Sequence, residues 1–174
     1  MRKKSREKTD WQSFLKSLSE IEVDFVIIGG SALTLYGIPR TTIDVDIEIS
    51  ATEDNIRRLV HGLEKAGLKL DNEDFLPLVT RPELLYGQCL SFSIPKGPQL
   101  IDVFLENPKD FSGLLRSSRK IEFGDFNIRV AALYEIRKMK LEIGRPIDLA
   151  DIALIDEFLE ITGEENGKKA HTKG

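Results

Sequence analysis

The acid–apolar–acid stretch from Asp44 to Asp46 is the part of the sequence whose residue types and spacing point most directly to chemistry. Polar and apolar residues alternate from residue 44 to residue 49, a pattern that predicts a strand with one buried face. Side chains two positions apart on a strand point to the same side, so both carboxylates would lie on one face, about 7 Å apart along the chain. Neighbouring anions repel each other, and a hard divalent cation such as Mg²⁺ or Mn²⁺ would relieve that repulsion. On spacing alone, two carboxylates that face solvent remain an alternative.

A third acid, Asp102, interrupts the apolar segment 100–104. The interior of a strand rarely contains an aspartate without a structural or functional reason. If this strand lies beside the one that carries Asp44 and Asp46, the three carboxylates form a cluster able to hold two cations about 3.5–4 Å apart. Such a pair stabilises the attacking and leaving oxygens of a phosphoryl transfer. The alternative is an edge strand on which Asp102 faces water.

The corner Gly29-Gly30-Ser31 follows an apolar run and precedes a predicted helix. Glycines let backbone N–H groups approach a phosphate closely, and Ser31 offers a hydroxyl beside them. A tight strand-to-helix turn without any ligand would use the same residues. Other phosphate and nucleophile motifs, namely G-x-G-x-x-G, G-x-x-x-x-G-K and G-x-S-x-G, are absent from the sequence.

Together these segments resemble the nucleotidyltransferase superfamily of the DNA polymerase β type. In that superfamily a GG or GS corner precedes an acid–apolar–acid strand, and a third acid lies on a later strand. Residues 138–152 are similar to the terminal helical motif of the AbiEii-like branch, which includes minimal transferases and the toxins of toxin–antitoxin pairs. The resemblance covers residues 20–160 and implies an α+β fold, a single domain in which a nucleotidyltransferase-type mixed β-sheet is flanked by helices.

The resemblance also implies an activity, the transfer of a nucleoside monophosphate from an NTP to an acceptor with release of pyrophosphate. Asp44, Asp46 and Asp102 would bind Mg²⁺ (or Mn²⁺) and act in catalysis, Asp102 also as the base for the acceptor hydroxyl. Lys140 would be a further catalytic residue that reaches the triphosphate or the acceptor, with Asp148 orienting it. The nucleotide-binding residues would be Gly29, Gly30, Ser31, Arg40 and Asp148.

Each of the less specific residues also has a purely structural interpretation. Arg40 suits either a phosphate contact or an ordinary surface loop. Lys140 suits a solvated helix face, and Asp148 suits an acid in the first turn of a helix, where the helix dipole favours it. Sequence alone leaves these alternatives open.

Two other function classes fit the same residues. One is a catalytically idle relative that acts as a binding partner in a toxin–antitoxin pair, and the other is a two-metal nuclease. The glycine corner disfavours the nuclease, which needs no triphosphate cradle. The acceptor could be a tRNA, a protein or a small molecule, and its recognition could need a partner protein or a second copy. A tRNA would require a basic groove, for which the candidates are Arg57, Arg58, Arg116, Arg119, Lys120, Arg137 and Lys138.

Length and composition restrict the classes further. The chain has 174 residues, with 25 Lys+Arg against 29 Asp+Glu and a formal charge of −4. This length predicts one domain, and the mildly acidic balance argues against coating nucleic acid through bulk charge. A single cysteine, no signal peptide and no apolar run of about 20 residues predict a cytoplasmic protein that makes no membrane contact.

The elements that must position these residues follow from hydrophobic periodicity. We expect a flexible basic N-terminus over 1–8, a nucleotidyltransferase domain over 9–163 and a disordered tail over 164–174. Residues 71–87 show no clean period and predict loop or weak strand. Strands are expected over 23–28, 44–49, 88–94, 100–105, 120–123 and 126–130, and helices over 9–18, 31–36, 52–66, 131–143 and 147–161.

Overall fold

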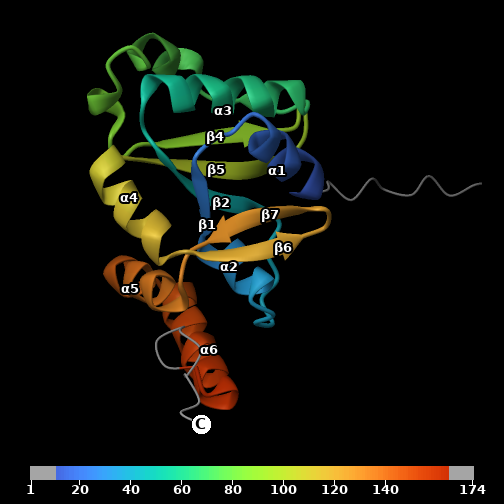
Figure 1. Cartoon of the computed structure of the whole chain (residues 1–174), viewed down its shortest axis with the longest axis vertical. Helices are drawn as coiled ribbons and strands as arrows, with labels where there is room; N and C mark the ends of the chain where they lie inside the picture. Colours follow the sequence, from blue (N-terminus) through green and yellow to red (C-terminus); the bar gives the residue numbers. More distant parts are fainter. Residues whose placement is uncertain (1–10, 165–174) are drawn as a thin grey trace, which may run out of the picture.

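A mixed β-sheet forms the centre of the molecule (Figure 1). The computed structural model describes residues 11–164, and within that range seven strands are joined in the order β3-β4-β5-β2-β1-β7-β6. Every residue of β1 is buried, as expected for a central strand covered on both faces. The strands are β1 (Phe25–Ile28), β2 (Val45–Ser50), β3 (Lys69–Leu70), β4 (Cys89–Ser93), β5 (Gln99–Glu106), β6 (Arg119–Phe123) and β7 (Phe126–Val130).

The pairing of β2 with its two neighbours sets the position of the acidic residues. β2 runs antiparallel to β1 and parallel to β5. In this register Asp46 lies opposite Ile28 on one side and opposite Asp102 on the other. Two strands that are far apart in sequence therefore bring two carboxylates to one point of one sheet face.

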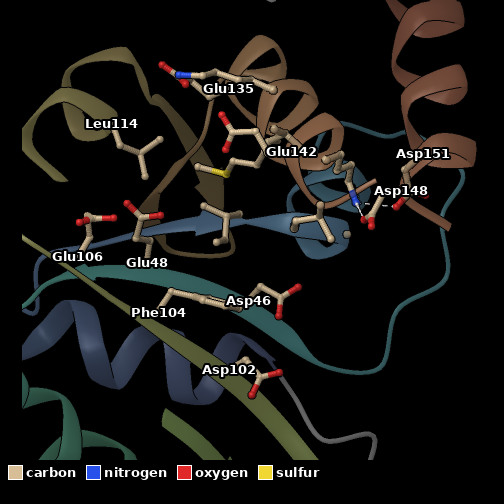
Figure 2. A pocket seen from close by; sticks show the side chains of 18 of the residues that line it. Asp46, Glu48, Asp102, Phe104, Glu106, Leu114, Glu135, Glu142, Asp148 and Asp151 are labelled. Atoms are coloured by element: carbon tan, nitrogen blue, oxygen red, sulfur yellow. Dashed lines mark hydrogen bonds and ion pairs between the residues drawn. The ribbon is translucent and has the colours of Figure 1, made fainter. Parts of the chain in front are cut away.

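Helices cover both faces of the sheet (Figures 1 and 2). The buried apolar residues of β2 point toward the side of α1 and α3, and its polar residues point toward the side of α4 and α5. α6 packs against α5. The α-helices are α1 (Trp11–Glu20), α2 (Gly29–Leu35), α3 (Glu53–Lys65), α4 (Pro108–Ser117), α5 (Leu133–Ile143) and α6 (Pro146–Thr162), with 3₁₀ turns η1 (Glu73–Leu78) and η2 (Pro82–Leu85).

Local capping explains where several of these helices begin and end. Thr52 accepts a hydrogen bond from the backbone N–H of Asn55 at the start of α3 (3.3 Å). At the start of α4 the side chain of Asn107 accepts from the N–H groups of Lys109 (2.9 Å) and Asp110 (3.1 Å). Gly144 ends α5 in the left-handed conformation (φ 67°), which allows the chain to turn directly into α6.

The structure confirms the α+β class and the mixed sheet flanked by helices. It differs from the sequence expectation at α4, for which no element was predicted. Residues 71–87, expected to be loop or weak strand, contain the short turns η1 and η2 joined by loop and no strand. Glu164, the first residue of the tail expected from sequence, makes an ion pair with Arg119 (3.1 Å). The expectations for residues 1–8 and 165–174 lie outside the described residues. None of the helices within residues 11–164 is long and apolar enough to cross a membrane.

Candidate active site

The three aspartates singled out by the sequence lie together at one end of β2, and Figure 2 shows two of them, Asp46 and Asp102. Asp46 is on β2, Asp102 is on β5, and Asp44 immediately precedes β2. Each carboxylate is half-buried and offers an oxygen within 4.8 Å of an oxygen of both others. β5 lies between β4 and β2, so the edge-strand alternative for Asp102 is wrong. The predicted carboxylate cluster is confirmed, and we call these residues the acidic triad.

Neighbouring hydroxyls hold two carboxylates of the acidic triad in place. Ser91 on β4 donates to Oδ1 of Asp102 (2.5 Å), and the Cys89 thiol lies 3.8 Å from the same oxygen. Thr42 donates to Oδ1 of Asp44 (3.1 Å). Among residues 11–164, no lysine or arginine makes an ion pair with any member of the acidic triad. The triad is oriented by the protein, but its charge is left uncompensated.

The electrostatics of Asp46 show this lack of compensation. Burial, followed by the charges of Asp44 and Asp102, raises the pKa of Asp46 to about 6, although Lys140 and Arg145 act in the opposite direction. Convergent carboxylate oxygens without a paired cation are the ligand set that suits Mg²⁺ or Mn²⁺. The residues present therefore fit a divalent metal ion.

Gly29 brings the glycine corner against the acidic triad. Its φ of 63° is in the left-handed region, and a Cβ at this position would overlap Oδ2 of Asp46. Position 29 therefore requires glycine for both conformation and space. A Cβ at Gly30 would only touch the guanidinium of Arg40 at ordinary contact distance. Both glycines line the cleft described below.

Ser31 has a different position from the one expected. The side chain is fully buried, and its hydroxyl donates to the carbonyl of Ile28 (2.9 Å) and accepts from the N–H of Asp46 (3.2 Å). The hydroxyl therefore ties the corner to β2 instead of facing the cleft. The reason is geometric, because in the first turn of α2 the Ser31 side chain reaches back to the carbonyl of Ile28, three residues earlier.

A second group of charged residues, which we call the ion-pair network, lies next to the acidic triad. Lys140 is only 6% exposed and donates to Asp151 (2.7 Å), with Asp148 at 3.6 Å. Arg40 also donates to Asp151 (2.8 Å), and Arg145 donates to Asp148 (2.7 Å). The network therefore joins the loop before β2 to α5 and α6.

These contacts decide between the alternatives for the network residues. Lys140 is buried, so the solvated helix face is wrong. Asp148 lies in the first turn of α6, where its carboxylate accepts from the N–H of Arg145 (3.1 Å), and it also faces Lys140. The hydrogen bond from Arg145 holds the pKa of Asp148 below its usual value. Asp151 was not among the predicted site residues, and its spacing of three from Asp148 on one helix was the available signal.

A cleft of about 1200 Å³ joins the acidic triad and the ion-pair network. It continues along the sheet between α4 and α5, where Glu48, Phe104, Glu106 and Glu135 line it. Burial and the charges of the surrounding acids Glu106, Glu135 and Asp110 raise the pKa of Glu48 to about 7. This part of the site was not predicted from the sequence, although Glu48 continues the same alternation as Asp44 and Asp46.

The basic residues considered for an RNA groove are dispersed. Arg116 and Lys138 line the cleft. The others for which ion pairs are seen have acidic partners elsewhere: Arg57 with Glu53, Arg58 with Asp54, Arg119 with Glu164 and Arg137 with Asp156. They therefore do not form one basic groove at the acidic triad.

Comparison with solved structures identifies the fold. No family model matches the chain, and no curated protein matches it in sequence. An antigenic nucleotidyltransferase-like protein from Paracoccidioides brasiliensis superposes with a TM-score of 0.54 at 18% identity, over 87% of this chain and 75% of that one. A candidate nucleotidyltransferase from Thermotoga maritima superposes with a TM-score of 0.52 at 16% identity, over 85% of this chain and 93% of that one. The chain therefore has the nucleotidyltransferase-like fold.

Proposed function

We propose that the protein is a Mg²⁺-dependent nucleotidyltransferase that transfers a nucleoside monophosphate from an NTP to the hydroxyl of an acceptor and releases pyrophosphate. The observation that carries the proposal is that the acidic triad converges beside the glycine corner and beside the lysine and arginines of the ion-pair network. The nucleotidyltransferase-like fold supports it.

The acidic triad would hold the metal. When bound, Mg²⁺ would neutralise the charge that develops on the phosphate oxygens and on the attacking and leaving oxygens. The raised pKa of Asp46 agrees with a site that gains from a cation, because the carboxylates repel one another without it.

The ion-pair network would position the triphosphate. Arg40, Lys140 and Arg145 line the same cleft as the acidic triad and carry the positive charge that a triphosphate needs. Asp148 and Asp151 hold these side chains by direct ion pairs. In this role the two acids act through the cations and do not contact the nucleotide.

Asp102 would accept the proton from the acceptor hydroxyl, as the hydroxyl oxygen attacks the α-phosphorus. A bond forms between that oxygen and the α-phosphorus, while the bond from the α-phosphorus to the oxygen bridging to the β-phosphate breaks. Pyrophosphate leaves with the electron pair of the broken bond. The hydrogen bond from Ser91 to Asp102 supports this role, since it fixes the orientation of the carboxylate.

The test is incubation of the protein with each of the α-labelled NTPs, Mg²⁺ and cell extract, followed by identification of the labelled product. Wild-type protein should transfer label and release pyrophosphate, and D46N should not. D156N is a matched control, because Asp156 is an exposed acid on α6 outside the cleft. Degradation of nucleic acid without NTP would identify a nuclease instead. If the protein binds NTP but releases no pyrophosphate even when cell extract is added, it is a catalytically idle binding protein.

A further inference from the structure

The cleft extends beyond the acidic triad into a second compartment. Its floor is the face of β2 and β5 that carries Glu48, Phe104 and Glu106, and α5 contributes Glu135 from the opposite wall (Figure 2). We call this compartment, defined by these four residues, the acidic arm. It opens into the same cleft as the acidic triad, so a molecule in the arm has direct access to the reacting atoms.

The acids of the acidic arm are more buried than the cations around them. Glu48, Glu106 and Glu135 are half-buried, whereas the cations that line this part of the cleft, Lys109, Arg116 and Lys138, are exposed. In the described part of the chain, none of the three glutamates makes an ion pair. Half-buried acids that line one compartment and lack cationic partners favour a positively charged ligand.

An aromatic ring distinguishes the acidic arm from a solvated patch of acids. Phe104 is on an interior strand, directly opposite Glu48 and between Asp102 and Glu106 on the same face of β5, yet it is 39% exposed. Leu114 and Met139 add apolar surface nearby. A concave surface that combines an exposed ring with a few convergent polar groups is typical of a small-molecule site.

The position of the acidic arm matches that of an acceptor. In Figure 2, Asp46 and Asp102 lie between the arm and the ion-pair network. If the cations of the network hold the triphosphate, pyrophosphate leaves on their side. An in-line displacement then places the acceptor hydroxyl on the opposite side of the α-phosphorus, toward the arm.

We propose that the acceptor is a small organic cation, a ring compound that carries both a hydroxyl and a protonated amine. Its ring contacts Phe104, and its amine lies among Glu48, Glu106 and Glu135. The fate of the hydroxyl rests on the proposed function: its oxygen bonds to the α-phosphorus as the bond to pyrophosphate breaks, and its proton goes to Asp102. The seating of the amine is independent of catalysis. A polyanionic acceptor such as RNA would be repelled by the same glutamates.

The test is calorimetric binding to the full chain without NTP, so that it is separate from the transfer assay. Streptamine, a cyclitol with two amines and several hydroxyls, is compared with scyllo-inositol, which has the same ring and no amine. A short single-stranded RNA is the third probe. We expect binding of streptamine and no binding of scyllo-inositol or RNA.

Variants then assign the site. E106Q and E135Q should each weaken streptamine binding about tenfold, since each removes one charged hydrogen-bond acceptor. F104A should also weaken it. E122Q, an exposed acid outside the cleft, is the charge-matched control and should bind as wild type does. Circular dichroism verifies folding, and E135Q on a helix surface serves if E106Q in the sheet does not fold.

Three results would overturn the proposal. These are equal affinity for streptamine and scyllo-inositol, unchanged affinity in both glutamate variants, or RNA binding that is lost when Lys109, Arg116 and Lys138 are replaced by alanine. Amine binding without nucleotidyl transfer would contradict the proposed function alone. Transfer of label to RNA would contradict the acceptor class alone.

Discussion

The acidic triad and the ion-pair network contain the same residue type in opposite electrostatic situations. In the network, Asp148 and Asp151 each have a cationic nitrogen within 2.8 Å. In the triad, the carboxylates face one another, and no described cation pairs with them. The pKa of Asp148 is accordingly lowered by Arg145, whereas the pKa of Asp46 is raised to about 6 by burial and by the other acids.

This contrast separates acids whose charge is paired within the chain from acids whose charge is left for a ligand. Paired charges in the network are satisfied within the chain, so breaking them leaves buried charges uncompensated. Charges in the triad are unsatisfied within the chain, so removing one relieves repulsion. The following variants test that difference.

The largest effect is expected for D46N on activity. Nucleotidyl transfer should fall about 10³-fold, because a metal ion contributes several kcal/mol of transition-state stabilisation and the variant loses one of its ligands. The measurement is pyrophosphate release with saturating NTP and Mg²⁺. Activity within a few-fold of wild type would remove Asp46 from the metal site.

The next largest effect is expected for D151A on stability. The free energy of unfolding should fall by about 3–5 kcal/mol, because Lys140 and Arg40 lose their shared partner in a buried setting. Urea denaturation measures it. D156A is the control on the same helix, where the exposed pair with Arg137 should contribute about 0–1 kcal/mol. Equal losses in the two variants would refute the special role of the network.

The pH dependence of stability should distinguish Asp46 from ordinary acids. The folded-state pKa of about 6 lies above the ordinary aspartate pKa of 3.8, so the folded protein binds more protons than the unfolded chain between these pH values. Stability from this group is therefore present below pH 3.8 and is lost as pH rises through 6. In metal-free buffer, wild type should lose on the order of 3 kcal/mol relative to D46N as pH rises across this window. Parallel pH profiles of the two proteins would contradict this.

The smallest effect compares two glycines with positive φ. G29A combines backbone strain with overlap of Asp46, whereas G37A carries the strain alone, since nothing lies within 4 Å of a Cβ there. G37A should lower the free energy of unfolding by about 1 kcal/mol, and G29A by about 2 kcal/mol. Thermal denaturation of both variants measures the difference. A smaller loss in G29A would show that the corner is not packed against the triad.

The sequence predicted the acidic triad because its signal is local. Alternation from Asp44 to Asp46 places both acids on one face, and Asp102 is conspicuous within an apolar strand. The sequence did not show that β2 pairs with β5, because this is a contact between strands more than 50 residues apart. The same alternation extends to Glu48, so the sequence pattern already indicated the polar face of β2 that lines the cleft.

Two other features could not be predicted as readily. Arg40 and Asp151 are separated by 111 residues, and no local pattern indicates such an ion pair. The Ser31 hydroxyl was expected to face a phosphate, because composition alone does not show which side of a corner faces inward. By contrast, α4 did have a local signal: Asn107 before Pro108 is a common way to begin a helix.

The central claim is that the acidic triad is a divalent metal site, and a calorimetric titration with Mg²⁺ tests it most directly. Wild-type protein and the control D156N should show the same saturable binding, which should be lost in D46N and D102N. Such binding would occur without NTP and without any acceptor, so it is independent of catalysis. Absence of saturable Mg²⁺ binding to wild type, or equal binding by D46N, would contradict the account.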